Sequence, residues 1–231
     1  MRLRNLIRAL VLVLVMSVAA GASFSAAAKS RWYHVEVIVF QHNDVGAADG
    51  EQWPDLGSLP DFRDAINLFG NRPSESAPAN GEQPNEVALP GPIAFQSLPG
   101  KLLKMSGVYR RLRDLGAYTP IAHVGWRQLG LGGTRARSVY ISDKPRLAAD
   151  ISATSLDPSG AQLVEGSVQI RVGRLLHVVT DFVKYGATAP VRITEQRQVK
   201  LKEIHYFDHP LFGVIVQVTP YRAADPGDVP D

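Results

Sequence analysis

The stretch RWYHVEVIVFQH, residues 31–42, decides the fold. Alternate residues of an extended chain point to opposite faces, and both faces of this segment carry bulky apolar side chains. We therefore interpret it as a central strand that is covered on both sides. Glu36 lies on the more mixed face, among apolar neighbours. A buried carboxylate needs a partner, so we predict that Glu36 pairs with an Arg or a His.

The segment that precedes this strand has the pattern of a secretory signal peptide. Residues 1–8 contain three arginines and no acid, residues 9–20 are almost wholly apolar, and small residues follow. The apolar run is shorter than the ~20 residues that a membrane span needs. We predict a signal peptide over 1–28 with cleavage after Ala28, a periplasmic location and no stable membrane anchor. An uncleaved N-terminal anchor is the alternative.

Charge and cysteine content exclude several classes of function. The whole chain has 25 basic and 22 acidic residues. Without Arg2, Arg4 and Arg8 the two counts are equal at 22, and a nucleic-acid-binding domain would keep a basic excess. The chain contains no cysteine, which excludes disulfides, thiolate zinc sites and cysteine nucleophiles.

One main helix and one long loop are predicted in the first half of the chain. Apolar residues recur at helical spacing over 97–116, between Ser97 and Gly116 as possible caps. The basic residues of this helix form either a solvated face or a contact with anionic wall or lipid groups. A short helix is predicted near 59–69. Repeated prolines predict a mobile loop over 70–92.

The remainder of the chain is predicted to be mostly strand. Gly173 makes a tight turn between two alternating segments, so these form a hairpin. The segment 191–200 has few apolar residues, which suits an edge strand or a bent outer strand. The predicted strands are 31–42, 118–128, 137–142, 163–172, 174–185, 191–200 and 213–221. We predict an α+β fold: a largely antiparallel sheet of about seven strands, one main amphipathic helix and the Pro-rich loop. Residues 29–221 would form one domain, followed by a disordered tail over 222–231.

No catalytic or metal-binding motif is found. His205 and His209 are four residues apart, but in an extended chain this separation is about 13 Å, too far for one metal ion. The sequence contains no G-x-S-x-G, S-x-x-K or H-E-x-x-H motif and no phosphate-binding loop. We therefore predict a protein that is not an enzyme and uses neither metal nor cofactor.

Several segments taken together resemble a known family. They are RWYHVEVIVFQH (31–42), YTPIAHVGWRQ (118–128), GSVQIRVGRLLHV (166–178) and LKEIHYFDHPLFGVIVQVTPY (201–221), in that order. The set resembles the CsiV family of periplasmic peptidoglycan-binding proteins of Gram-negative bacteria. The resemblance implies a non-enzymatic protein that binds cell-wall polymer. It also implies support for wall synthesis by a class A penicillin-binding protein, through that synthase's outer-membrane lipoprotein activator.

The residues themselves suggest which side chains would bind a glycan. Aromatic rings stack on sugars, while amide and guanidinium groups bind hydroxyls and stem-peptide carboxylates. Candidates of these types are Trp126, Arg127, Gln128, Trp32 and Tyr206. If the strand that contains GWRQ ends near Gln128, Trp126 and its neighbours lie at an open sheet rim. The alternative is that both tryptophans belong to the core.

Two other functions are compatible with the sequence. The chain could be an envelope adaptor that binds proteins and has no affinity for glycan, or it could be a wall hydrolase. Sedimentation with purified sacculi separates binding from a pure adaptor role, and release of muropeptides would identify a hydrolase.

Overall fold

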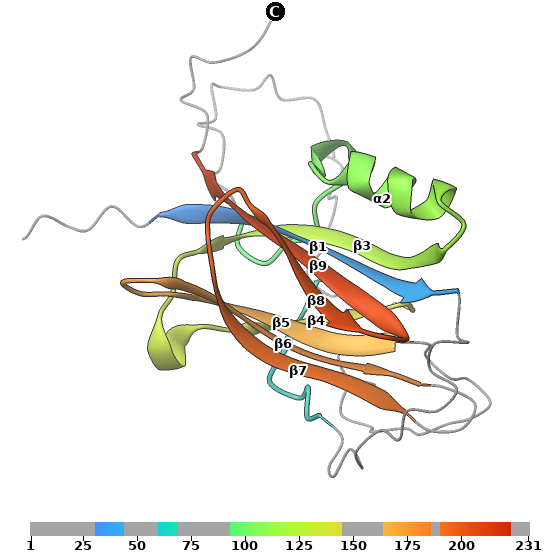
Figure 1. The fold of residues 1–231 in the computed structure, drawn as a ribbon. Helices are drawn as coiled ribbons and strands as arrows, with labels where there is room; N and C mark the ends of the chain where they lie inside the picture. Colours follow the sequence, from blue (N-terminus) through green and yellow to red (C-terminus); the bar gives the residue numbers. More distant parts are fainter. Residues whose placement is uncertain (1–30, 44–59, 69–92, 145–163, 186–189, 223–231) are drawn as a thin grey trace, which may run out of the picture. The chain divides into compact units, whose positions relative to one another are not determined.

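The computed structural model describes two β-sheets, with one α-helix against the outer face of the first (Figure 1). Sheet A has four strands in the order β3-β1-β9-β8, and sheet B has five in the order β2-β4-β5-β6-β7. The described residues are 31–43, 60–68, 93–144, 164–185 and 190–222. The predicted α+β character is confirmed, but the single sheet of about seven strands is wrong.

Sheet A is built around the opening stretch. β1 (Trp32–His42) pairs antiparallel with β3 (Tyr118–Leu129) on one side and β9 (Phe212–Tyr221) on the other. β8 (Ile204–His209) pairs with β9. β1 is thus a central strand with both faces covered, as its two apolar faces predict.

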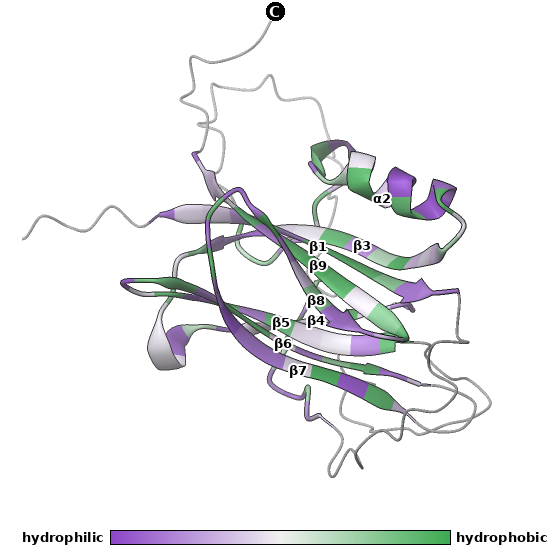
Figure 2. Cartoon of the chain, viewed as in Figure 1, coloured by the Kyte–Doolittle hydropathy of each residue, from purple (hydrophilic) through white to green (hydrophobic). Residues whose placement is uncertain are grey.

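Sheet B is an antiparallel meander with one short parallel edge. Its strands after the first follow one another along the sheet: β4 (Ser138–Ser142), β5 (Val164–Val172), β6 (Leu176–Lys184) and β7 (Val191–Val199). β7 is the edge strand that its sparse apolar content predicts. Figure 2 shows β7 as largely hydrophilic, with hydrophobic positions near its start. The other edge is β2 (Ile66–Asn67), parallel to β4, which replaces the helix predicted near 59–69.

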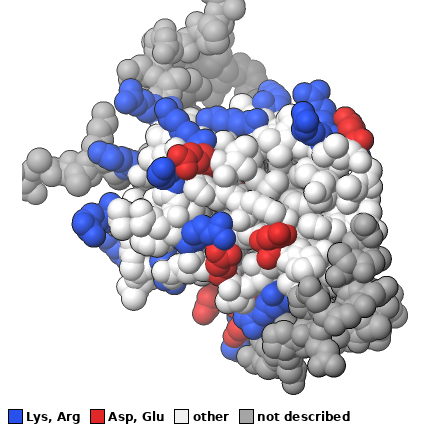
Figure 3. Space-filling model, in the orientation of Figure 1, with Lys and Arg blue, Asp and Glu red and all other residues white. Residues whose placement is uncertain are grey.

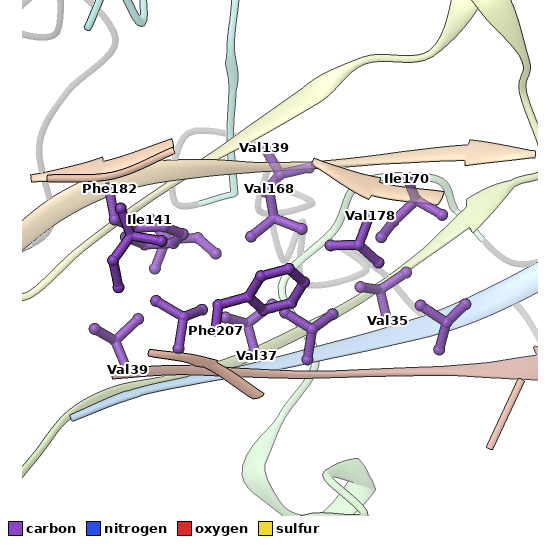
Figure 4. Packing of buried hydrophobic residues seen from close by; sticks show 14 of the residues in the cluster. Val35, Val37, Val39, Val139, Ile141, Val168, Ile170, Val178, Phe182 and Phe207 are labelled. Carbon is purple, nitrogen blue, oxygen red and sulfur yellow. The ribbon is translucent and has the colours of Figure 1, made fainter. Parts of the chain in front are cut away.

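The main core fills the space between the two sheets. Val35, Val37 and Val39 of β1 point toward sheet B, and Phe207 of β8 lies between the layers (Figure 4). The facing side chains come from β4, β5 and β6: Val139, Ile141, Val168, Ile170, Val178 and Phe182. Burial of these branched and aromatic groups is the main force that holds the two sheets together.

The main helix, α2, is shorter than predicted. It spans Ser106–Asp114, after a 3₁₀ turn η2 at Gly100–Leu102. Pro99 and Gly100 break the longer helical pattern, so the chain first makes this tight turn. Gly116 has a φ of +67°, as expected of a residue that ends a helix. A second 3₁₀ turn, η3, spans Gly133–Arg135.

α2 packs its apolar side on the outer face of sheet A. A second hydrophobic cluster joins Met105, Val108, Tyr109 and Leu112 to residues of β1, β3 and β9, including Ile38. Leu102, which the longer helix would place on the same stripe, is exposed. No helix among the described residues is long and apolar enough to cross a membrane. The predicted signal peptide, the loop over 70–92 and the tail beyond Arg222 lie outside the described residues.

Candidate functional site

A buried carboxylate fixes the start of α2 to sheet A. Glu36 is fully buried and accepts hydrogen bonds from the backbone amides of Lys104 and Met105, each at 2.7 Å. The Nε2 of His123 lies 2.6 Å from its Oε1, and the Nε2 of His34 lies 3.4 Å from its Oε2. The predicted pairing of Glu36 with a His is therefore confirmed. The negative charge sits where helix N-terminal amides converge, which favours the ionised form.

The hydrogen-bond partners of Glu36 lower its pKa more than its burial raises it. Burial alone would raise the pKa of the carboxyl group. The hydrogen bond from His123, the neighbouring His34 and the bonds from the Met105 and Lys104 amides act in the opposite direction. Together they lower the pKa of Glu36 to about 2. At neutral pH Glu36 is thus an anion that holds the helix against the sheet.

Next to Glu36, the outer face of sheet A carries a basic and aromatic surface. We call it the Arg127 patch, and it consists of Trp32, Lys104, Arg127 and Tyr221. The strand register creates it, because Trp32 pairs with Tyr221 and Arg127 pairs with His34. The guanidinium carbon of Arg127 lies 4.0 Å from the centre of the Tyr221 ring, a cation–π contact.

Lys104 reaches the same patch from the helix side. Its Nζ donates to the Oγ1 of Thr219 at 3.2 Å, and Thr219 pairs with His34 in the sheet. The Nε of Arg127 is buried and has no hydrogen-bond partner among the described residues. The patch therefore has two cations, one of which stacks on a ring, and the half-buried Trp32 lies beside it.

Two of the five predicted site residues lie in the core. Trp126 and Gln128 are fully buried on the inner face of β3, and the indole Nε1 donates to Gln128 Oε1 at 2.7 Å. β3 does end near Gln128, but its inner face points into the core, so the expected open rim is wrong for these two residues. The side chain of Leu103 also covers Gly125, where a Cβ would meet it at 2.6 Å.

The structure brings Trp32 and Arg127 together on the outer face of sheet A, whereas Tyr206 lies elsewhere on that face. Tyr206 lies on β8, the edge strand opposite β3. Lys104 and Tyr221 were not among the sequence candidates. The alternation of residues 213–221 indicates which face of the strand Tyr221 occupies. Only the pairing of β1 with β9 places Tyr221 beside Trp32. Lys104 has no local signal that sets it apart from other lysines.

Charge is distributed unevenly over the molecule. Residues 93–142 contain eight Lys or Arg and a single acid, Asp114. In Figure 3, several Lys and Arg side chains gather along the upper side of the view, where acidic side chains are few. A chain that is neutral after residue 28 thus has one basic side, which composition alone does not reveal.

The outer face of sheet A therefore carries basic and aromatic groups side by side at the Arg127 patch. Among the described residues, no group of three or more His, Asp or Glu could hold a metal ion. The family model described as "Peptidoglycan-binding protein, CsiV" matches residues 8–221, and the chain belongs to this family. The family is described by binding and not by an enzymatic activity. No curated protein and no solved structure matches the chain.

Proposed function

We propose that this chain is a non-enzymatic envelope protein that binds peptidoglycan through the Arg127 patch. The observation that carries the proposal is the pair of cations, Arg127 and Lys104, beside the Trp32 and Tyr221 rings on one face. Peptidoglycan combines the two matching chemistries, since its stem peptides carry carboxylates and its glycan strands present sugar rings. The family description supports the same ligand.

The geometry suggests a role for each side chain. The Tyr221 ring holds the Arg127 guanidinium in place, so little side-chain freedom is lost when a carboxylate binds. Lys104 adds a second positive charge on a flexible stem, and Trp32 offers an apolar surface to a sugar. Glu36 does not touch this ligand: it positions Lys104 by binding the backbone amide of that residue.

We further propose a periplasmic location, reached through the signal peptide over 1–28. There, wall binding would support synthesis by a class A penicillin-binding protein through the synthase's outer-membrane lipoprotein activator. The sequence resemblance supports this role. Affinity for the wall would keep the protein beside new glycan, where the synthase and its activator act.

Sedimentation with purified sacculi tests the proposal. Arg127→Ala and Lys104→Ala should each weaken retention about tenfold, because a charge-assisted hydrogen bond contributes ~1.5–3 kcal/mol. Retention of the unchanged protein should also fall as salt is raised from low to physiological strength. Arg174→Ala, an exposed cation at the β5–β6 turn, is the matched control and should sediment normally.

Melting temperatures measured in parallel show whether the variants remain folded. Normal sedimentation of both patch variants would place the wall-binding surface elsewhere. Failure of the unchanged protein to sediment would favour a pure protein adaptor. Muropeptide release from the sacculi would identify a hydrolase.

A further inference from the structure

A second group of aromatic and polar side chains lies at the other end of the outer face of sheet A. It consists of Phe40 and His42 of β1 with Tyr206 and Asp208 of β8, and we call it the Tyr206 platform. Phe40 is stacked on His42 with ring centres 5.6 Å apart and planes 10° apart. It is also stacked on Tyr206, with centres 5.8 Å apart and planes 20° apart. Three nearly parallel rings therefore stand side by side.

A glycine in the strand below allows these rings to pack directly against the backbone of the sheet. Gly213 of β9 lies beneath them, and a Cβ at that position would come within 2.7 Å of the Phe40 ring and 2.9 Å of the Tyr206 hydroxyl. Phe40 is buried, whereas Tyr206 remains 37% exposed. Tyr206 is thus supported by its neighbours and still accessible to a ligand.

Polar groups at the rim of the platform hold the Tyr206 ring in one orientation. Its hydroxyl donates to Asp208 and lies 3.3 Å from the Nε2 of His42. Burial and the contact with Asp208 raise the pKa of Tyr206, so the hydroxyl stays protonated and keeps donating. The Asp208 side chain is 60% exposed, which leaves the carboxylate able to accept further hydrogen bonds.

We propose that the Tyr206 platform binds an uncharged pyranose ring, with an N-acetylhexosamine of the glycan strand as its ligand. Sugar C–H groups pack on an exposed aromatic ring, and sugar hydroxyls donate to a carboxylate beside it. The exposed charge of Asp208 disfavours the carboxylates of stem peptides, which are the ligands proposed for the Arg127 patch. The proposal rests on the proposed function only for the choice of wall glycan as the ligand.

The two surfaces are too far apart to hold the same sugar. The rows of sheet A that contain Arg127 and Gly213 are six residues apart along β1, about 20 Å. β3 and β8 are also separated by the two strands between them, about 14 Å across the sheet. One surface would therefore bind the peptide-bearing part of the polymer and the other its sugar backbone.

An uncharged N-acetylglucosamine tetramer tests the Tyr206 platform independently of the Arg127 patch, because the tetramer has no carboxylate for Arg127 to bind. Its binding to the purified chain is measured by calorimetry and by NMR shifts of the backbone amides. The amides of 204–213 should shift in the unchanged protein. Tyr206→Ala should weaken binding about tenfold, as expected for the loss of one stacked ring. Tyr206→Phe should retain most of the affinity.

Ile204→Ala is the matched control, since Ile204 is an exposed apolar residue on the same strand and face. It should bind the tetramer normally. Absence of tetramer binding by the unchanged protein, or shifts confined to other strands, would overturn the proposal even if Tyr206→Ala failed to fold. The proposed function would still hold in that case if the unchanged protein were retained on sacculi and Arg127→Ala were retained more weakly.

Discussion

The outer faces of the two sheets use carboxylates in different ways. On sheet A, Glu36 is fully buried beneath the start of α2, and backbone amides and histidines surround it. On sheet B, Asp181 lies at a half-exposed position and accepts two hydrogen bonds from the Arg192 guanidinium, both at 2.7 Å. The buried anion therefore fixes how the helix meets the sheet, whereas the half-exposed pair keeps an outer face polar and contributes little to folding.

Replacement of the buried carboxylate should have the largest effect. Glu36→Ala leaves two amides and His123 without their acceptor, and it removes the charge beside the buried His34, at a cost of about 3–5 kcal/mol. For a chain of this size, 1 kcal/mol corresponds to roughly 2–4 °C, so the melting temperature should fall by about 10 °C. Thermal unfolding followed by circular dichroism measures this fall. A change within error would show that the helix is held by its apolar contacts alone.

Low pH should weaken the contact between Glu36 and the start of α2 slightly less than Glu36→Ala does. The folded pKa of Glu36 is about 2, below its ordinary value of 4.5. A lowered pKa gives stability that is present above pH 4.5 and is lost as the pH falls toward 2. The loss amounts to about 3 kcal/mol. Urea unfolding at a series of pH values from 6 to 2 should show it, and Glu36→Gln should remove this part of the slope. An unchanged slope in Glu36→Gln would assign the acid sensitivity to other groups.

The half-exposed pair should show the smallest effect. Asp181→Ala removes two hydrogen bonds from an Arg192 side chain that water can reach, so we expect a loss of about 1 kcal/mol or less. The melting temperature should fall by no more than about 4 °C, and added salt should reduce the difference further. If Asp181→Ala lowered the melting temperature as much as Glu36→Ala, burial would not explain the difference between the two carboxylates.

Apolar patterning made most strands of this fold predictable. β3, β5, β6 and β9 bury one face in the shared core, so their apolar period is visible in the sequence, while β1 is recognisable by apolar residues on both faces. The division into two sheets was not predictable, because alternation says which residues are buried but not which strand pairs with which. β2 has only two residues, too few for any pattern. The helix was predicted too long because its apolar spacing continues through η2, where Pro99 and Gly100 prevent regular helix.

The candidate site depends on register, which no local pattern contains. Trp126 and Arg127 are adjacent in sequence, yet the first lies in the core and the second on the outer face. A shift of one residue in the pairing of β1 with β3 would exchange them. The histidine partner of Glu36 was predictable in kind, because a buried charge requires one. Its identity as His123 depended on the same register.

The pairing of β1 with β9 also determines when the chain can complete its fold. The first described strand hydrogen-bonds along its length to the last described one, so sheet A cannot form fully until the chain has been synthesised through Tyr221. Contacts between such distant segments close slowly, since the loop between them must be ordered first. During that delay β1 can pair with β3, but the edge of β1 that β9 later covers is left open, and an open edge of a largely apolar strand is a site of aggregation. A premature stop before residue 212 would leave it permanently in this state.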